Sequence, residues 1–392
     1  MTRLTLRPGH DRRLRSGHPW IFSNEIASLD PHPANGAAVE IYTAKGECLG
    51  SAYYNGHSLI AARRMSRQRE SIDSLDFFRT RFSTAAMYRR SLYGPETNAV
   101  RLVFGESDGL PGLVVDRYAE VLAVQLLTLG MEHRKEIILA ALLQEFTPRA
   151  VVWRNDAGVR ELEGLTRHVE MAWGEPPGEV GVGENGLSFL VDVCGGQKTG
   201  HFLDQKENHR ALDGRVEGHR VLDLFCYSGS WSIHAARYGA KEVIGVDISA
   251  AAITLAERNA HRNELHQRCR FVKADVFDLL RELERKRERF GTIILDPPAF
   301  VKSKKKLPEA IKGYLTINRR AMELLEPGGF LFTCSCSYHM DRETFLDTLR
   351  QAAAQAGREC RLVEMRGQAF DHPVLLACPE TDYLKCAVLQ VL

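Results

Sequence analysis

Apolar runs alternate with helical periodicity along the last two hundred residues of the chain. From about residue 186, short runs such as VLDLF, EVIGVD, TIILD and FLFTCSC are each followed by a longer stretch of helical pattern. Such alternation predicts βαβ units on a parallel sheet. The final runs RLVEMRG and YLKCAVLQVL predict two closing strands. We therefore expect an α/β domain over residues 186–392.

The pattern differs over the first 185 residues. Residues 1–75 hold short strand-like runs (AAVEIYT, GECLGSAYYN, SLIAARRMS) separated by glycines, which predicts a small β-barrel or sandwich. Over residues 76–185, the helical patterns DFFRTRFSTAAMYRRSLY and HRKEIILAALLQEF accompany strand-like runs, which predicts a central α+β domain. WGEPPGEVGVGENG, at its end, predicts a linker or hairpin run.

Length and composition limit the number of domains and the cellular compartment that we expect. A chain of 392 residues is too long for one ordinary core, which agrees with three domains. No window has the apolar length of a membrane span, and MTRLTLRPGHDRR lacks the apolar segment of a signal peptide. The nine cysteines are odd in number and scattered, which favours a reducing cytoplasm over a disulfide framework.

The net charge is only +2, so any basic surface must be confined to one part of the protein. The stretch RPGHDRRLRSGHPW interleaves Arg12, Arg13 and Arg15 with Trp20, and bases beside aromatics suit nucleic acid through phosphate charge and stacking. A solvated turn with one buried tryptophan is the alternative, and charge alone favours it.

Four successive strand-like runs in the last domain carry an acidic residue at or near their ends: Asp223, Asp247, Asp275 and Asp296. Ligands of an open parallel sheet bind outside these carboxyl ends, and an acid after the second strand suits ribose hydroxyls. The first turn, YSGSWS, has Gly229 but not the pattern GxGxxG, which weakens a dinucleotide interpretation. A nucleoside without phosphates fits better, and S-adenosylmethionine is such a ligand.

The run FLFTCSCSYHM sets Cys334 and Cys336 at the end of a buried strand. They are candidates for core filler, half a metal site or a nucleophile. A zinc site is disfavoured because no second Cys or His pair stands at ligand spacing. Cys334 lies deeper in the strand and is best explained as a small core residue.

These motifs together resemble one family. VLDLFCYSGSWSIHAARYGAKEVIGVDIS resembles the first motifs of a class I methyltransferase. With GQKTGHFLDQKENHR, DPPAF and CSYHM, the chain resembles the ribosomal RNA large-subunit methyltransferases that make 5-methylcytosine. LRPGHDRRLRSGHPWIFSNEI resembles the opening of their PUA domain, while FGESDGLPGLVVDRY and WRNDAGVRELEGL resemble their central domain. The resemblance covers essentially the whole chain.

The resemblance implies a cofactor site for S-adenosylmethionine. The Asp223 loop and Gly229 would approach its methionine part, Asp247 its ribose and Asp275 its adenine amino group. The GQKTG segment would fold over the cofactor, although its Lys198 is also a candidate for the nucleic-acid backbone. The expected cofactor residues are Gln197, Thr199, Asp223, Phe225, Tyr227, Gly229, Asp247, Ile248, Asp275, Val276 and Asp296.

The resemblance also implies the catalytic pair Cys336 and Asp296. A Cys336 thiolate would add to C6 of cytosine, and the N-terminus of a helix starting near Asp341 would lower its pKa. Asp296 would hydrogen-bond N3 of the base. Lysines of the run KSKKK (Lys302, Lys304 and Lys305) would hold RNA near the base, with a solvated loop as an equal alternative.

Two other functions stay open. Methyltransferases acting on base nitrogens, including guanine N7, also carry DPP before an aromatic residue and need no thiol. A non-catalytic RNA-binding or ribosome-assembly factor is the second, and a dinucleotide oxidoreductase is a distant third. We expect a cytoplasmic enzyme that methylates C5 of a cytosine in large-subunit ribosomal RNA, without membrane or metal, and a homodimer is left open.

Overall fold

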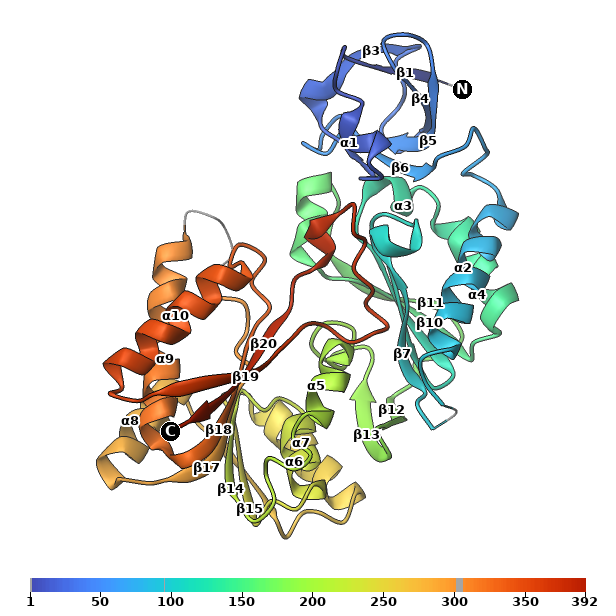
Figure 1. Ribbon diagram of the computed structural model, residues 1–392. Helices are drawn as coiled ribbons and strands as arrows, with labels where there is room; N and C mark the ends of the chain where they lie inside the picture. Colours follow the sequence, from blue (N-terminus) through green and yellow to red (C-terminus); the bar gives the residue numbers. More distant parts are fainter. Residues whose placement is uncertain (1, 95, 301–305) are drawn as a thin grey trace. The chain divides into compact units, whose positions relative to one another are not determined.

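Residues 2–94, 96–300 and 306–392 are described in the computed structural model of the chain (Figure 1). The chain divides into two compact units. The first comprises the residues up to Gly183 together with Val191–Leu203 and Phe370–Thr381. The second comprises Glu184–Leu190, Asp204–Ala369 and Asp382–Leu392. The first unit thus holds the first two predicted domains, and the boundaries at 75 and 185 stay predictions.

A six-stranded sheet forms the N-terminal part of the first unit, in the order β2-β6-β5-β4-β1-β3. Its strands are β1 (Thr2–Leu6), β2 (Trp20–Ile21), β3 (Ile26–Asp30), β4 (Ala38–Tyr42), β5 (Cys48–Tyr54) and β6 (Ala62–Ser66), with the one-turn helix α1 (Arg12–Arg15). The small β domain is confirmed, but only β4 to β6 were predicted. In β1, Leu4 and Leu6 are buried on one face, so the missed strand follows the usual alternation.

A five-stranded sheet in the order β11-β10-β9-β8-β7 forms the other part of this unit. Its strands are β7 (Ala99–Phe104), β8 (Leu113–Tyr118), β9 (Val121–Leu126), β10 (Ala150–Asn155) and β11 (His168–Trp173). Helices α2 (Leu75–Arg90) and α4 (Lys135–Phe146) pack against each other, and the short α3 (Leu129–Glu132) precedes α4. Phe78, Phe82 and Leu142 are fully buried in this core, so the predicted α+β arrangement is confirmed.

The predicted linker or hairpin run contains strand β12 (Glu179–Glu184), which pairs with β13 (Leu187–Asp192) in a two-stranded sheet. Asn185 and Gly186 form the connection, and both have positive φ angles, 52° and 76°. Two central residues of this kind are what a tight hairpin turn requires, because its twist then matches that of the strands. The glycine-rich composition therefore marks a hairpin here.

The second unit is built on a seven-stranded sheet in the order β16-β15-β14-β17-β18-β20-β19. The strands are β14 (Arg220–Leu224), β15 (Glu242–Asp247), β16 (Cys269–Lys273), β17 (Phe290–Leu295), β18 (Leu325–Ser335), β19 (Cys360–Arg366) and β20 (Lys385–Val391). Strands β14 to β18 are parallel, as predicted. Strand β20 pairs antiparallel with both β18 and β19, so the two closing strands are antiparallel to each other.

Helices connect these strands (Figure 1). They are α6 (Ser230–Arg237), α7 (Ala250–Arg262), α8 (Val276–Lys286), α9 (Leu307–Leu324) and α10 (Arg342–Gln355), and the short α5 (Lys206–Arg210) precedes β14. The apolar stripe of α9 supplies Tyr314, Ile317 and Ala321 to a core shared with Leu295 and Leu331 of the sheet. Among the described residues, no helix combines the length and apolarity needed to cross a membrane.

Candidate functional site

Three of the four predicted acids stand at the carboxyl ends of neighbouring strands. Strand β14 lies between β15 and β17 and pairs with both in parallel, so these strands end at one edge of the sheet. Asp223 precedes the last residue of β14, Asp247 ends β15, and Asp296 follows β17. The fourth acid differs from expectation: β16 ends at Lys273, and Asp275 is the N-cap of helix α8.

Asp247 is held by backbone donors on both carboxylate oxygens. Oδ2 accepts from the Tyr227 N–H at 3.1 Å, and Oδ1 accepts from the Ser249 N–H at 2.9 Å. Each carboxylate oxygen can accept a second hydrogen bond, so the group suits a pair of ribose hydroxyls. Ile248 beside it is 67% exposed, which leaves an apolar surface at this strand end.

Asp275 has a structural role in its own helix. Its Oδ1 accepts from the N–H groups of Phe277 and Asp278 at 2.9 and 3.1 Å, and this caps α8. An acid at this place is thus explained without a ligand, and its contact with adenine stays a prediction. Val276 next to it is buried, 4% exposed.

The loop after β14 has an unusual backbone. Phe225 and Tyr227 adopt φ angles of 67° and 46°, a left-handed region that side chains disfavour. Gly229 has φ 82°, and a Cβ atom on it would lie 3.0 Å from the Ala256 Cβ and 3.1 Å from the Phe271 ring. Two strained residues and a tightly packed glycine therefore fix the path of the loop ahead of helix α6.

Asp223 carries a buried oxygen that lacks a hydrogen bond. Its Oδ2 accepts from Ser232 Oγ at 2.6 Å, whereas Oδ1 has no partner among the described residues. Burial raises the pKa of the Asp223 carboxyl to about 7; the Ser232 bond opposes this shift, and the charges of Asp296 and Asp247 add to it. An unpaired buried acceptor favours a cationic or donor group. S-adenosylmethionine carries an ammonium and a sulfonium, so the residues fit this cofactor.

Asp296 is oriented by two side chains that the sequence patterns did not single out. Its Oδ2 accepts from Gln205 Nε2 at 3.0 Å and from Trp231 Nε1 at 3.2 Å. The Gln205 carbonyl accepts in turn from Asn208 Nδ2 at 2.6 Å, so the amide nitrogen of Gln205 points toward Asp296. Both residues lie within quoted motifs, but their contacts span 91 and 65 positions, which no local pattern reveals.

The two cysteines of FLFTCSCSYHM have different environments. Cys334 lies inside β18, opposite Cys386 of β20, and is fully buried, as predicted for a core residue. Burial raises its pKa well above that of an ordinary thiol. Cys336 lies just past the end of β18 and is partly exposed. Because β18 neighbours β17, Cys336 and Asp296 both follow strands that end at the same edge.

Lys385, at the start of β20, is a further group near Cys336 that the sequence patterns missed. Its ammonium donates to the carbonyls of Ser337 and Tyr383 at 2.9 and 2.8 Å. Burial lowers the pKa of Lys385, and its interaction with Cys336 opposes that shift. Asp341, five residues after Cys336, caps α10 by accepting from the Thr344 N–H at 2.7 Å. A cation and a helix N-terminus therefore accompany the thiol, as is typical of reactive cysteines.

The predicted residues of the GQKTG segment belong to the first unit. Thr199 is buried there and donates to Asp116 at 2.6 Å, while its hydroxyl also lies 2.9 Å from the Tyr118 hydroxyl. Gln197 and Lys198 are exposed, and the Lys198 ammonium lies 4.4 Å from the centre of the Phe202 ring. The acids at the strand ends belong to the second unit, so the cofactor role of this segment stays a prediction.

Most of the predicted RNA-binding residues near the N-terminus have acidic partners. Arg13 pairs with Glu25 at 3.1 Å, and Arg15 pairs with Asp11 at 2.5 Å and also with Glu47. Trp20 likewise donates from Nε1 to Glu106 at 2.8 Å, whereas Arg12 is exposed. The predicted lysines Lys302, Lys304 and Lys305 lie outside the described residues.

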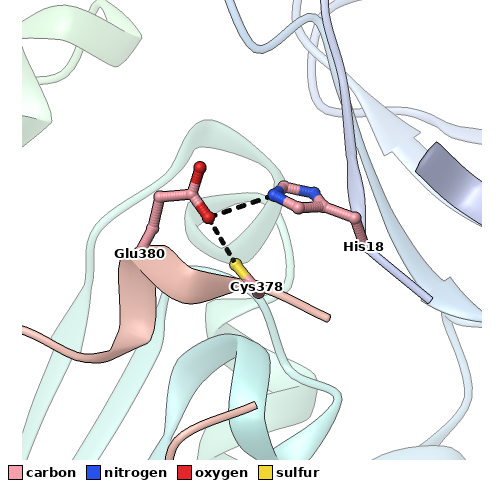
Figure 2. A group of neighbouring side chains, drawn as sticks. All are labelled: His18, Cys378 and Glu380. Atoms are coloured by element: carbon pink, nitrogen blue, oxygen red, sulfur yellow. Dashed lines mark hydrogen bonds and ion pairs between the residues drawn. The ribbon is translucent and has the colours of Figure 1, made fainter. Parts of the chain in front are cut away.

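Two clusters contain the residue types that bind metals. In the first unit, His18 Nε2 and Cys378 Sγ lie 3.1 and 3.4 Å from the same carboxylate oxygen of Glu380 (Figure 2). His18 Nδ1, however, accepts from the Trp20 N–H at 3.1 Å, which assigns the proton of the neutral ring to Nε2. A protonated Nε2 donates to Glu380 and does not bind a metal, so this cluster is a hydrogen-bonded network.

The second cluster lies in the second unit and joins Glu184, His209 and His234, all buried. His209 Nδ1 pairs with Glu184 at 2.8 Å, and His234 Nδ1 lies 2.8 Å from the Ser230 carbonyl. Asn185 Nδ2 lies 3.3 Å from His234 Nε2. These bonds explain the cluster as a buried polar network, and we assign a metal to neither group.

Comparison with known proteins agrees with this fold. A family model of S-adenosylmethionine-dependent methyltransferases matches residues 109–368, and a model of a PUA-like domain matches residues 4–67. The class is thus an S-adenosylmethionine-dependent methyltransferase with a PUA-like N-terminal domain. A putative methyltransferase from Streptococcus mutans has the same fold, with a TM-score of 0.86 at 23% identity over 100% of both chains. Another, solved in complex with SAH, has a TM-score of 0.87, also at 23% identity over 100% of both chains.

Curated relatives specify the family. The chain is 42% identical over 386 residues to ribosomal RNA large subunit methyltransferase I of Aeromonas hydrophila, covering 97% of each chain. It is 41% identical over 389 residues to the protein of that name from Vibrio cholerae, covering 98% of each. The chain belongs to the ribosomal RNA large subunit methyltransferase I family.

Proposed function

We propose that this protein transfers a methyl group from S-adenosylmethionine to C5 of a cytosine in large-subunit ribosomal RNA. The names of its relatives and its PUA-like domain support the RNA substrate. The observation that carries the choice of atom is the position of Cys336. Cys336 is partly exposed and follows β18, while Asp296 follows the neighbouring strand β17. The ammonium of Lys385 interacts with Cys336.

The chemistry explains why a thiol is required. C5 of cytosine is too weak a nucleophile to attack a methyl sulfonium by itself. The thiolate of Cys336 adds to C6, and the ring electrons this releases make C5 nucleophilic. S-adenosylmethionine, when bound, would supply an electrophilic methyl group: C5 would take it as the bond from that methyl to the sulfonium sulfur breaks, with S-adenosylhomocysteine as the leaving group. Loss of the C5 proton to a base then expels the Cys336 thiolate and restores the ring, so one difficult substitution becomes two easier steps.

Asp296 acts on the base during the addition. As the sulfur bonds to C6, negative charge develops at C5 and spreads through C4 to N3, and a carboxyl group sharing a proton with N3 stabilises that charge. Gln205 and Trp231 both donate to Oδ2 of Asp296, so they fix the rotation of the carboxyl group. The Lys385 ammonium favours the thiolate form of Cys336 before the attack.

The test compares Cys336→Ser with wild type, using tritiated S-adenosylmethionine and ribosomal RNA that lacks this modification. Cys334→Ser is the matched control, because it changes the buried thiol two residues away. We expect Cys336→Ser to lose transfer while retaining cofactor affinity, and Cys334→Ser to retain transfer in whatever fraction folds.

Other outcomes would reject the proposal. Normal transfer by Cys336→Ser would exclude the covalent route and favour methylation of a base nitrogen. RNA binding without any transfer by wild type would indicate a non-catalytic binding factor.

A further inference from the structure

A cavity of about 770 Å³ opens within the first unit. It is lined by strand β6, the N-terminal turns of helix α2 and the short helix η2 (Gly105–Asp108), and its volume is in the range of sites that enclose small ligands. None of the residues predicted from the sequence to bind cofactor or RNA lines this cavity. The lining residues that decide its chemistry are Gly17, Arg64, Arg67, Ser74 and Arg81.

Arg64 is the unusual residue of this cavity. Its side chain lines the cavity, the residue is only 8% exposed, and within the described residues the guanidinium has neither an acceptor nor an ion pair. Arg63, its neighbour in β6, is buried to the same degree but pairs with Glu163 at 2.9 Å and Glu106 at 3.5 Å. Buried charges are normally paired, so an uncompensated arginine favours an anion from outside the protein.

The electrostatics of Arg64 agree with this interpretation. Burial, and to a smaller extent the charge of Arg67, lower the pKa of its guanidinium to about 10. No carboxylate contributes to the shift. A bound anion would offset both causes, since it would supply acceptors and an opposite charge.

Two further arginines line the same cavity. Arg67 is exposed and, within the described residues, has no acidic partner. A Cβ atom on Gly17 would lie 2.8 Å from a terminal nitrogen of Arg67, so the absence of a side chain lets this arginine approach. Arg81 donates to the Met65 carbonyl at 3.2 Å, and its ion pair with Glu70 is long, at 3.8 Å.

The acids of the lining already have basic or donor partners. Glu106 accepts from Trp20 at 2.8 Å and from Arg63 at 3.5 Å, and Asp76 lies 3.9 Å from Arg79. Helix α2, which is 16 residues long, begins at the cavity with Ser74 as its N-cap. The positive end of a helix favours an anion, and here it adds to the charge of an unpaired, buried arginine.

We propose that this cavity binds a phosphate group of the RNA backbone and so positions the substrate on the first unit. The inference rests on the proposed function for the identity of the ligand as RNA, and on Arg64 for the binding site itself. Arginine donates two parallel hydrogen bonds to phosphate oxygens, and the cavity lining provides three guanidinium groups. A free phosphate shares this chemistry, and the experiment separates the two sources.

The test measures the affinity of the full-length protein for a labelled transcript of unmodified large-subunit ribosomal RNA over a range of salt concentrations. The variants are Arg64→Gln and Arg67→Gln, and the matched control is Arg117→Gln, an exposed arginine outside the cavity. Loss of one phosphate contact reduces the slope of log K against log salt by about 0.9. We expect both cavity variants to bind about tenfold more weakly with that smaller slope, and Arg117→Gln to match wild type.

Since Arg64 is buried, thermal unfolding of each variant is compared with wild type, and the exposed Arg67 gives a second variant that leaves the interior intact. Wild-type affinity and slope in folded Arg64→Gln and Arg67→Gln would overturn the proposal. Arginine-dependent stabilisation by inorganic phosphate, with unchanged RNA binding, would also overturn it in favour of a free anion. Arginine-dependent RNA binding without methyl transfer by wild type would support the cavity and reject the proposed function.

Discussion

The sequence predicted binding roles for acids in the second unit and for arginines in the first unit. In the structure, the two groups of residues have different surroundings. Asp223, Asp247 and Asp296 lie at one edge of the sheet, where the strand pattern predicted them. Arg13 and Arg15 of the N-terminal stretch pair with acids, whereas the guanidinium of Arg64, in a strand with no special pattern, is buried without a partner among the described residues. Position at a strand end follows from local sequence, but the availability of a charge depends on distant neighbours.

This difference has a physical origin. A parallel sheet places every carboxyl end at the same edge, so an acid after a strand is brought to the site by topology alone. An arginine on a small β domain has no such constraint, and its long side chain reaches whichever carboxylate lies within range. Glu47, which pairs with Arg15, is 32 positions away in the chain. Charge runs are therefore weaker predictors of a binding surface than strand ends.

Among the acids of the second unit, we expect a substitution of Asp296 to have the largest effect on the rate of methyl transfer. Asp296→Asn keeps the shape but loses the carboxylate, so kcat should fall by about 10² to 10³, the loss typical of one stabilising group. Cofactor affinity should change little if its main contacts are at Asp247. Asp278→Asn, an exposed acid on α8, is the control. Normal kcat in Asp296→Asn would remove this residue from the catalytic pair.

Asp223 predicts a pH dependence of cofactor binding. Its ionised form is needed to meet a cationic ligand, and its pKa is about 7. Affinity for S-adenosylmethionine, measured by calorimetry, should be full above about pH 7 and should weaken as pH falls, by up to about tenfold per pH unit. In Asp223→Asn the affinity should be lower and independent of pH over this range. An equal pH dependence in that variant would assign the proton to another group.

The sign for stability without cofactor is opposite. The folded pKa of Asp223, about 7, exceeds the ordinary value of 3.8, so the folded protein binds the proton more tightly than the unfolded chain. Its contribution therefore favours folding more as pH falls from about 7 toward 4, and Asp223→Asn should remove this trend. Denaturant unfolding at several pH values measures both.

Gly229 and Gly328 form a matched pair for the cofactor loop. Their φ angles are 82° and 83°, but a Cβ atom on Gly328 meets nothing within 4 Å, whereas one on Gly229 meets Ala256 and Phe271. Gly328→Ala should lose about 1 kcal/mol of unfolding free energy, the cost of a left-handed alanine. Gly229→Ala should lose about 1 to 2 kcal/mol more, because packing adds to this cost. Equal losses would show that the loop relaxes freely.

Gln205 gives a smaller effect on the rate. Gln205→Ala removes a donor to Asp296 Oδ2 but leaves Trp231 in place, so kcat should fall about tenfold with little change in cofactor affinity. Gln351→Ala on the exposed side of α10 is the control. A change confined to thermal stability would make Gln205 a structural residue only.

Much of the fold was accessible from the sequence because periodicity is local. The order of strands and helices from β14 to α10 follows directly from apolar runs, and the quoted motifs placed Asp247 and Cys336 at strand ends. The sequence pattern did not predict β1, whose Leu4 and Leu6 alternate over only five residues. The contact of Gln205 with Asp296, and the lack of a partner for Arg64 within the part of the chain that the structure describes, depend on how distant segments pack, so no local pattern predicts them.

The most direct test of the central claim is the trapping of a covalent complex between Cys336 and RNA. Ribosomal RNA transcribed with 5-fluorocytidine allows addition to C6 and methylation at C5, but the fluorine cannot leave as the proton does, so the adduct persists. Wild type and Cys334→Ser should give a complex that survives denaturing electrophoresis only with S-adenosylmethionine present, and Cys336→Ser should give none. A complex with Cys336→Ser, or none with active wild type, would contradict the mechanism.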